Sequence, residues 1–422
     1  MALKAITLET LRPVAEKEQV AAIAHADGVQ RMVVTTAFDL EEKERAVWLL
    51  PVPGTGDAVK IEVWDYFPIP DGTDPVAEAH QKMSALFSGI RAFSAITIPF
   101  ELMPSFSSSR GFASALVHSQ VEKFGVHAET ITATSIAALA EHLSANEVSV
   151  DPSTLATLEP YVDGRHVIIA VWVASAETVR KEFGSEIDEH MPAFLRDRRP
   201  CIYAEFPSDQ PFFPMRPTRA YGDVTVPLRL FVTGLVRPSV GPDLLDAFKM
   251  RVVIRDADED SPRRPVKKTK ATAVKDPPAL FRPSDAREMT IITADLPATA
   301  FTDDLRFEPH APASYVRARI VSNGAVFAWF PLVALFSYLA AGIAGVVMFG
   351  RWRKTAPLGL YLFATFFGLA LFLRNHRLAE LSPAWKDHSE VSVRRRFIVW
   401  TVFFYLAITS AVQVWATVWL GM

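Results

Sequence analysis

The sequence predicts an α+β fold: a mixed, largely antiparallel sheet domain with intervening helices, followed by three transmembrane helices. Short segments with strand composition recur before residue 256, and some are joined by tight turns. Segments with helical periodicity lie between them, as is typical of α+β domains. After residue 324 the chain contains three long apolar stretches separated by arginine-rich connectors, the pattern of membrane-crossing helices.

The predicted strands begin with a hairpin. Residues 20–26 and 30–37 flank Asp27 and Gly28, a pair typical of a tight hairpin turn. Residues 166–173 (HVIIAVWV) are almost all apolar, which predicts a strand covered on both faces. Pro227 predicts a sheet edge or a bulge in its strand, because proline cannot donate a backbone hydrogen bond. The other segments with strand composition are 46–53, 59–64, 117–124, 126–133, 201–206, 224–233, 251–255 and 288–294.

The predicted helices of the soluble region lie between these strands. The first begins at Asp74 and Pro75, which suit the N-cap and the first helical position. Its apolar face consists of Val76, Ala79, Met83, Leu86, Phe87 and Ile90. Further helical patterns cover residues 136–143, 152–162 and 176–196.

These patterns divide the chain into four parts. Residues 1–255 form a soluble α+β domain, and residues 256–285 form a charged, proline-rich linker or insertion. Residues 286–323 are a membrane-proximal segment. Residues 324–422 form the transmembrane region, whose apolar stretches are residues 325–350, 355–373 and 397–422. A fragment that ends near Ser314 is expected to keep its own core, because it loses only lipid-facing segments.

Charge and cysteine content exclude some functions. The net charge is −3, and nine Lys/Arg against three Asp/Glu after residue 324 give +6 there, so the preceding region carries −9. An acidic soluble region argues against nucleic acid as a partner. Cys201 is the only cysteine, which excludes an internal disulfide and a cysteine-based metal cluster.

Motifs for catalysis are largely absent. The sequence contains no phosphate-binding loop, dinucleotide fingerprint, HExxH or GxSxG motif, and it predicts no cofactor. Glu182, Glu186 and His190 share one face of a predicted helix, where they would either hold a divalent metal or form a solvated acidic face. His127 and Glu129 share a strand face and form either an acid/base pair or a plain surface pair.

The predicted membrane helices lack Asp, Glu, Lys, Arg and His, which argues against a transporter. Their distinctive feature is a row of small residues that includes Ala341 and Gly345, a spacing that lets another helix approach closely. The partner is either another span of this chain or another subunit, and the motif does not decide between them.

Several short motifs follow one another between residues 18 and 237. They are VVTT at 33–36 after the turn, VWLLPVP at 47–53, the hairpin around Gly125, LEPYV at 158–162, HVIIAVWV at 166–173, PFFPMR at 211–216 and VPLRL at 226–230. In this order they resemble a bacterial family of uncharacterised proteins, the domain of unknown function DUF2330. The resemblance implies an exported domain and no known activity.

Two lines of reasoning about the membrane side disagree. The first residues, MALKAITLETLRPVAEKEQ, are not a signal peptide, so either the domain stays on the side of synthesis or an export segment precedes this sequence. With three spans, eight basic residues lie on the side of the soluble domain, which favours the cytoplasm. They are Arg317, Arg319, Arg374, Arg377, Lys386, Arg394, Arg395 and Arg396, against Arg351, Arg353 and Lys354 on the other side. The family resemblance favours an extracytoplasmic, periplasmic domain.

The sequence therefore predicts a membrane-anchored, non-catalytic binding, assembly or scaffolding protein of the bacterial inner membrane. Its expected partners are the lipid bilayer and other membrane-protein subunits of a larger complex, to which it is an accessory subunit. The alternative is a metal-dependent hydrolase that uses the helix face of Glu182, Glu186 and His190.

Overall fold

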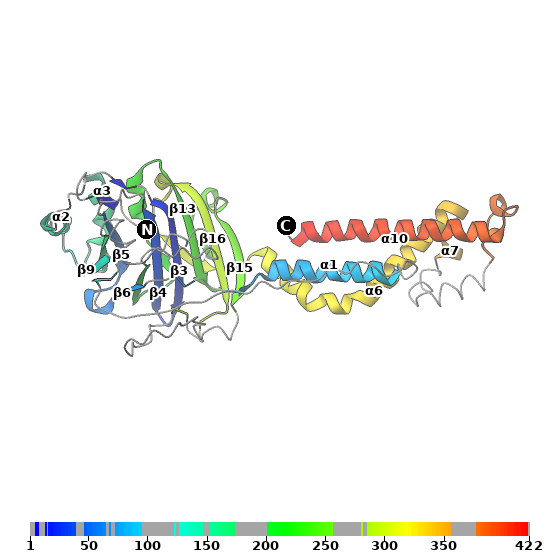
Figure 1. Ribbon diagram of the computed structural model, residues 1–422, viewed down its shortest axis with the longest axis horizontal. Coiled ribbons are helices and arrows are strands. Elements are labelled where there is room, and N and C mark those ends of the chain that lie inside the picture. Colours follow the sequence, from blue (N-terminus) through cyan, green and yellow to red (C-terminus); the bar gives the residue numbers. More distant parts are fainter. Residues whose placement is uncertain are drawn as a thin grey trace. The chain divides into compact units, whose positions relative to one another are not determined.

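The computed structural model forms two compact units, which we call the β-domain and the helical unit (Figure 1). The β-domain comprises Met1–Thr73 and Arg110–Pro312, and the helical unit comprises Asp74–Ser109 and Ala313–Met422. The structure describes residues 5–7, 13–14, 16–38, 46–64, 67–68, 72–94, 122–123, 126–146, 148, 150, 152–173, 201–255, 280–281, 285–356 and 377–420.

Two large sheets and one small sheet make up the β-domain. The six-stranded sheet has the order β2 (Pro13–Val14), β1 (Ala5–Thr7), β5 (Ala46–Pro53), β10 (His166–Val173), β9 (Val126–Ile131) and β8 (Glu122–Lys123). The eight-stranded sheet has the order β6 (Lys60–Trp64), β11 (Cys201–Pro207), β4 (Val29–Phe38), β3 (Glu16–Ala26), β13 (Thr225–Thr233), β16 (Glu288–Pro297), β15 (Lys249–Arg255) and β7 (Gly72–Thr73). The small sheet has the order β12 (Phe212–Phe213), β17 (Leu305–Pro309) and β14 (Val236–Pro238).

The pairing confirms a mixed, largely antiparallel sheet domain, since the ladder between β13 and β3 is parallel and the others described are antiparallel. The predicted hairpin is the pair β3 and β4. Asp27 (φ 54°) and Gly28 (φ 71°) both adopt the left-handed conformation that a two-residue hairpin turn requires. The last predicted strand is β16, which pairs with β13 on one side and with β15 on the other.

The edge prediction for the strand that contains Pro227 is wrong, because β13 lies between β3 and β16. The physical reason is local. The ladder with β3 runs from Leu228 to Val232, so Pro227 lies just before it and has a partner strand on one side only. The missing N–H therefore costs no hydrogen bond to β3.

The main core lies between the two large sheets. Trp48 and Leu50 on β5 and Ile169 on β10 belong to the same buried cluster as Ile23 on β3 and Leu230 on β13. On its other face, the six-stranded sheet packs against α2 (Ile136–Ala145) and α3 (Pro152–Leu158) through a second buried cluster. β10 contributes to both clusters, which confirms that this strand is covered on both faces.

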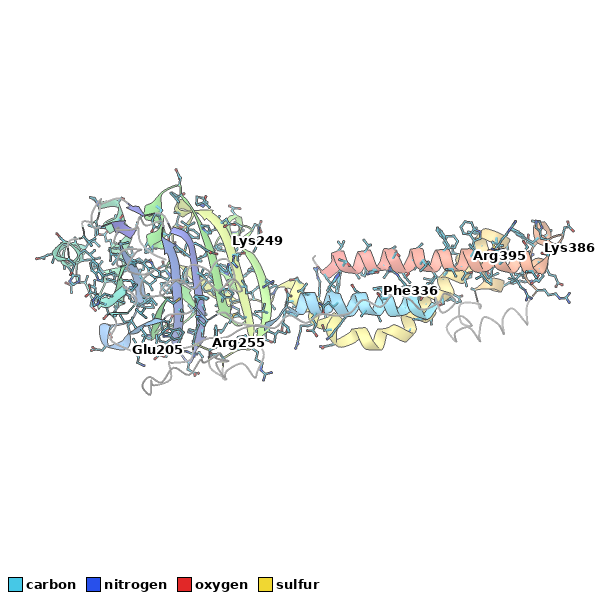
Figure 2. The ribbon with its side chains drawn as sticks, viewed as in Figure 1. Glu205, Lys249, Arg255, Phe336, Lys386 and Arg395 are labelled. Carbon is cyan, nitrogen blue, oxygen red and sulfur yellow. The ribbon has the colours of Figure 1, made fainter. Side chains whose placement is uncertain are left out.

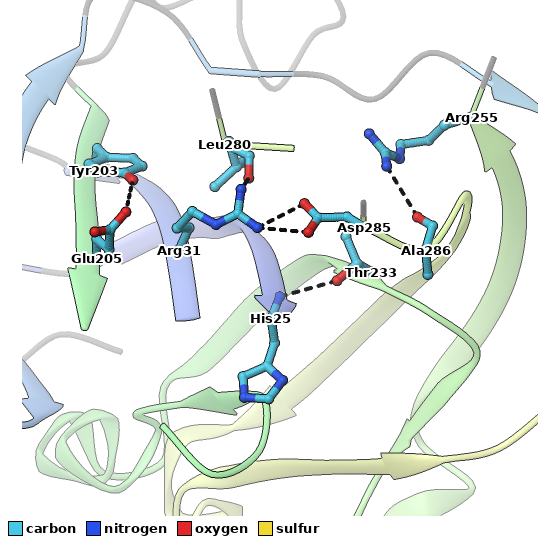
Figure 3. Close-up of polar contacts among 9 residues, drawn as sticks. All are labelled: His25, Arg31, Tyr203, Glu205, Thr233, Arg255, Leu280, Asp285 and Ala286. Atoms are coloured by element: carbon cyan, nitrogen blue, oxygen red, sulfur yellow. Dashed lines mark hydrogen bonds and ion pairs between the residues drawn. The ribbon is translucent and has the colours of Figure 1, made fainter. Parts of the chain in front are cut away.

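The outer face of the eight-stranded sheet carries a third buried cluster, which includes Leu280. Beside it, the guanidinium of Arg31 on β4 donates two hydrogen bonds to the Asp285 carboxylate, at 2.7 and 2.9 Å (Figure 3). Nη1 of Arg31 also donates to the Leu280 carbonyl at 2.7 Å. The last residues of the predicted linker, 280–281 and 285, thus belong to the core of the β-domain, and residues 256–279 lie outside the described residues.

Short helical turns connect the strands of the β-domain. They are η1 (Gly56–Ala58), η2 (Glu159–Tyr161), η4 (Arg216–Tyr221), α5 (Pro242–Leu245) and η5 (Ala298–Ala300). The predicted helix over residues 176–196 lies outside the part of the chain that the structure describes.

The helical unit contains α1 (Pro75–Ser94), α6 (Ala313–Phe349), α7 (Trp352–Thr355), η6 (Leu378–Leu381), η7 (Pro383–Trp385) and α10 (Glu390–Leu420). The predicted apolar face of α1 is confirmed, because Ala79, Phe87 and Ile90 are buried. These residues pack against α6 and α10, which lie alongside α1 (Figure 1), whereas the sequence alone assigns α1 to the soluble domain.

Two helices of the described residues are long and apolar enough to cross a membrane, where the sequence predicts three. They are α10 and the part of α6 from Pro331 to Phe349. Most of the middle stretch, residues 355–373, lies outside the described residues.

Candidate functional site

The predicted metal ligands Glu182, Glu186 and His190 all lie outside the described residues, so the metal site remains a prediction. Within the described ranges, no group of three or more His, Cys, Asp or Glu side chains is placed to hold a metal ion. Glu129 contacts His142 rather than His127 as its histidine partner, with 3.1 Å between Oε1 and Nε2. The same oxygen accepts a hydrogen bond from the Trp172 indole at 3.1 Å.

The small residues of α6 make room for a segment of the same chain. Ala341 is fully buried. A Cβ atom on Gly345 would overlap the Thr355 side chain, and a Cβ on Gly342 would lie 2.7 Å from the Trp352 ring. Both contacting residues belong to α7, which follows α6 directly. Gly342 and Gly345 thus contact α7, a partner that the sequence could not identify, whereas Ala341 belongs to a buried cluster with Leu378, Val393 and Phe397.

The C-terminal end of α6 is built together with the start of α10. The Trp385 indole donates a hydrogen bond to the Met348 carbonyl at 2.8 Å, which satisfies one of the unpaired carbonyls at the helix end. The Phe349 ring lies against Trp385 and Phe397. Leu378 belongs to the same buried cluster. The residues that follow α6 and those that precede α10 therefore lie at one end of the helical unit, which we call the basic end.

The opposite end joins the start of α6 to the last turn of α10. Arg317 donates a hydrogen bond to the Trp419 carbonyl at 2.6 Å, and its guanidinium lies 5.5 Å from the centre of the Trp419 ring. Ala318 and Leu420 pack together with Ala79 of α1. Consequently α6 and α10 run antiparallel, and α1 begins at this end.

Polar contacts hold α1 against the middle of α10. Arg91 donates hydrogen bonds to Ser410 Oγ at 3.1 Å and to Gln413 Oε1 at 2.7 Å. The Tyr405 hydroxyl donates to the Ile90 carbonyl at 2.9 Å. Sequence reasoning missed this cluster. The available signal was the presence of Ser410 and Gln413 inside a long uncharged stretch, where polar side chains usually have partners.

One side of α10 exposes large apolar side chains along the length of the helix. In soluble monomers, contiguous exposed apolar patches rarely exceed a few hundred Å². We call this surface the apolar stripe. It consists of Val391, Val399, Trp400, Val402, Phe403, Leu406, Val414, Trp415 and Val418, whose exposed fractions range from 40% to 77%.

Charge is distributed unevenly between the two ends of the helical unit. Lys386 and Arg395 both lie at the basic end (Figure 2). Among the described residues, eight basic side chains gather there, against three acidic ones: Arg351, Arg353, Lys354, Arg377, Lys386, Arg394, Arg395 and Arg396, with Glu380, Asp387 and Glu390. The opposite end has Arg317 and Arg319 on the first turns of α6, and Asp74, Glu78 and Lys82 at the start of α1.

No protein-family model, curated protein or solved structure matches this chain. The resemblance to DUF2330 therefore remains a prediction from the residues that carry it.

Proposed function

We propose that this chain is a membrane-anchored, non-catalytic binding or assembly protein, an accessory subunit of a larger membrane complex. The observation that carries the proposal is the apolar stripe of α10. A core helix of a soluble protein would bury these side chains, whereas Val399, Val414 and Val418 are each at least 60% exposed. Hydrocarbon is the solvent in which such a surface is stable.

The length and ends of α10 support the anchor. From Phe397 to Leu420 the helix has no charged residue. At about 1.5 Å per residue, this stretch exceeds the roughly 30 Å of a bilayer core. Trp415 and Trp419 stack at one end, and Trp385 lies at the other. Tryptophan is enriched at both membrane interfaces, so these positions fit the two boundaries of a span.

We infer that the soluble domain lies outside the cytoplasm, whereas the count of basic residues with three spans favours the cytoplasm. That count required residues 355–373 to cross the membrane. Thr355 and Leu378, which flank most of this stretch, both pack at the basic end, so α6 and α10 act as a two-span hairpin. The eight basic residues then lie together on one side, which the positive-inside rule assigns to the cytoplasm.

This assignment also fixes the side of the membrane on which the β-domain lies. The chain leaves β17 at Pro309 and enters α6 at Ala313, at the end opposite the basic residues. The β-domain is then extracytoplasmic, which agrees with the exported domain that the family resemblance implies. Binding by the β-domain would take place outside the cytoplasm, with the two helices as its attachment.

Single-cysteine labelling tests the orientation. Cys201 is buried, and Cys201→Ala supplies a background without cysteine. Arg287→Cys in the β-domain and Lys386→Cys at the basic end, both at exposed positions, are then treated with a membrane-impermeant maleimide on intact spheroplasts. We expect labelling of the former directly and of the latter only after permeabilisation. The reverse pattern, or equal behaviour of both sites, would contradict the hairpin orientation.

The assembly part of the proposal has a separate test. The native protein is extracted in mild detergent, and its mass is measured by mass photometry. We expect a species heavier than one chain plus its micelle. A lone monomer, together with release of the protein from membranes by alkaline carbonate, would reject both parts of the proposal.

A further inference from the structure

An open pocket of about 270 Å³ lies at one end of the β-domain. It is formed where β5 and β11 end and β10 begins, beside the β3–β4 turn and the small sheet. Its polar lining residues are His166, Ser208, Asp209, Gln210 and Arg306, and its apolar lining residues are Pro53, Pro207 and Phe212. Pockets for drug-sized ligands usually measure roughly 300–1,000 Å³, so this one suits a smaller molecule.

Buried polar residues fix the walls of this pocket. Gln30 is fully buried, and its amide both donates to the Phe212 carbonyl at 2.7 Å and accepts from the Phe212 N–H at 2.8 Å. The His25 ring contacts the Ser208 carbonyl at 2.8 Å. These contacts hold the 208–212 segment in place before any ligand arrives, which lowers the entropic cost of binding.

His166 is held in one orientation. Its Nδ1 lies 2.9 Å from Asp163 Oδ1, and the Tyr161 ring meets the imidazole edge-on. Burial raises the pKa of Asp163, but hydrogen bonds from His166 and Arg165 outweigh this effect and lower the pKa to about 2. Asp163 is therefore ionised at neutral pH, and its carboxylate fixes the orientation of the His166 ring. With Nδ1 engaged, Nε2 is the ring nitrogen left for a ligand.

Tyr161 is itself held in place by a hydrogen bond to Asp304. Its hydroxyl donates to Asp304 Oδ1 at 2.6 Å, and that oxygen also accepts from the backbone N–H groups of Met215 and Arg216, at 3.0 and 3.1 Å. Burial, reinforced by the Asp304 charge, raises the pKa of Tyr161, so the hydroxyl remains a donor. The histidine in the pocket thus rests on a rigid support.

Arg306 supplies the positive charge of the pocket. It is exposed on β17, between the inward-facing Leu305 and Phe307. Within the described part of the chain, no hydrogen bond or ion pair engages its guanidinium. A guanidinium presents two parallel N–H groups that match the two oxygens of a carboxylate.

Charge balance selects the ligand. Asp209 lines the same pocket as Arg306, and Asp163 lies behind His166. A doubly charged phosphate would be repelled by both carboxylates, whereas a molecule with one positive and one negative group has a partner for each. We propose that this pocket binds a free α-amino acid, with its carboxylate on Arg306 and His166 and its ammonium group toward Asp209.

Calorimetry on the full chain in detergent micelles tests the ligand class. The probes are the free L-amino acids, the amides and N-acetyl derivatives of those that bind, and inorganic phosphate. We expect at least one free amino acid to bind and its amide and N-acetyl forms to bind at least about tenfold more weakly. Equal binding of phosphate or of the N-acetyl form, or no amino acid bound at about 10 mM, would overturn the proposal.

Variants locate the site. Arg306→Gln and His166→Gln are each expected to weaken binding at least about tenfold, since each removes one carboxylate contact. Asp209→Asn should abolish the preference for the free over the N-acetylated amino acid. Arg287→Gln, an exposed arginine outside the pocket, is the matched control and should bind like the parent.

Melting temperatures of the unliganded variants show whether each is folded. Unchanged affinity in a folded Arg306→Gln protein would overturn the proposal. If Arg306→Gln does not fold, an unchanged preference of Asp209→Asn for the free over the N-acetylated amino acid would overturn it instead. The measurement does not depend on the membrane side or on partner subunits, so its failure would leave the proposed function standing, and the converse also holds.

Discussion

Among single residues, Arg31 and Asp285 form the most deeply buried ion pair described in the β-domain. Its side chain is 2% exposed and that of Asp285 is fully buried. Burying two charges costs several kcal/mol per ion, and an ion pair repays this only when its geometry is good and its remaining hydrogen-bonding groups have partners. The two bonds to Asp285 and the bond to the Leu280 carbonyl meet this requirement (Figure 3).

Removal of either partner should strongly destabilise the β-domain. We expect Arg31→Ala and Asp285→Ala each to lower the free energy of unfolding by about 3–5 kcal/mol, because each leaves one buried charge without its counter-ion. Urea unfolding of the full chain in micelles, followed by tryptophan fluorescence, measures this loss.

Lys60→Ala is the control for this prediction. Lys60 pairs with Glu205 at the same 2.7 Å, but the lysine side chain is 74% exposed. An exposed pair contributes less than about 1 kcal/mol, so this variant should unfold almost like the parent. Similar losses for Lys60→Ala and Arg31→Ala would contradict the role of burial.

At the scale of elements, two of the three glycines of α6, Gly345 and Gly324, lie in opposite environments. The helix has 37 residues with Pro331 inside it, and Gly345 lies against Thr355 of α7. Nothing lies within 4 Å of a Cβ atom built on Gly324 in the same helix. The same substitution at both positions therefore separates the packing of α7 from the intrinsic preference of a helix for alanine.

We expect Gly345→Ala to lower the melting temperature in micelles, because the new methyl group displaces Thr355 from α6. Gly324→Ala should leave stability unchanged or raise it by up to about 1 kcal/mol, since alanine favours the helix. Differential scanning fluorimetry of both variants and the parent measures these changes in melting temperature. Equal stabilisation by both substitutions would show that α7 does not pack on Gly345.

At the scale of the whole molecule, the two units interrupt each other along the chain. α1 belongs to the helical unit although it follows β7 of the β-domain after a single residue, Asp74. A fragment cut near Ser314, where the sequence alone places the boundary, would keep α1 but lose α6 and α10. Ala79, Phe87 and Ile90 would then lose the helices that bury them.

We therefore expect residues 1–312 to aggregate without detergent. The same fragment with residues 74–109 replaced by a flexible Gly/Ser linker should be a soluble monomer with one cooperative melting transition, because it retains the β-domain alone. Size-exclusion chromatography and circular dichroism distinguish the two fragments. Equal solubility of both would contradict the assignment of α1 to the helical unit.

The sequence by itself determined the elements whose signal is local. Turn chemistry at Asp27 and Gly28 predicted the first hairpin, and apolar composition predicted β10 as a strand covered on both faces. The long uncharged stretches after residue 324 predicted helices able to cross a membrane. Each of these signals lies within a short window of residues, where period and turn preference depend on nearest neighbours along the chain.

Only the tertiary structure decided which elements meet. Arg31 and Asp285 are separated by 254 positions, and His166 and Arg306 reach one pocket from different sheets. The helical periodicity of α1 predicted its apolar face correctly and was silent about what covers that face. An apolar face is stabilised by any apolar partner, so local pattern specifies that a surface is buried but not against which segment.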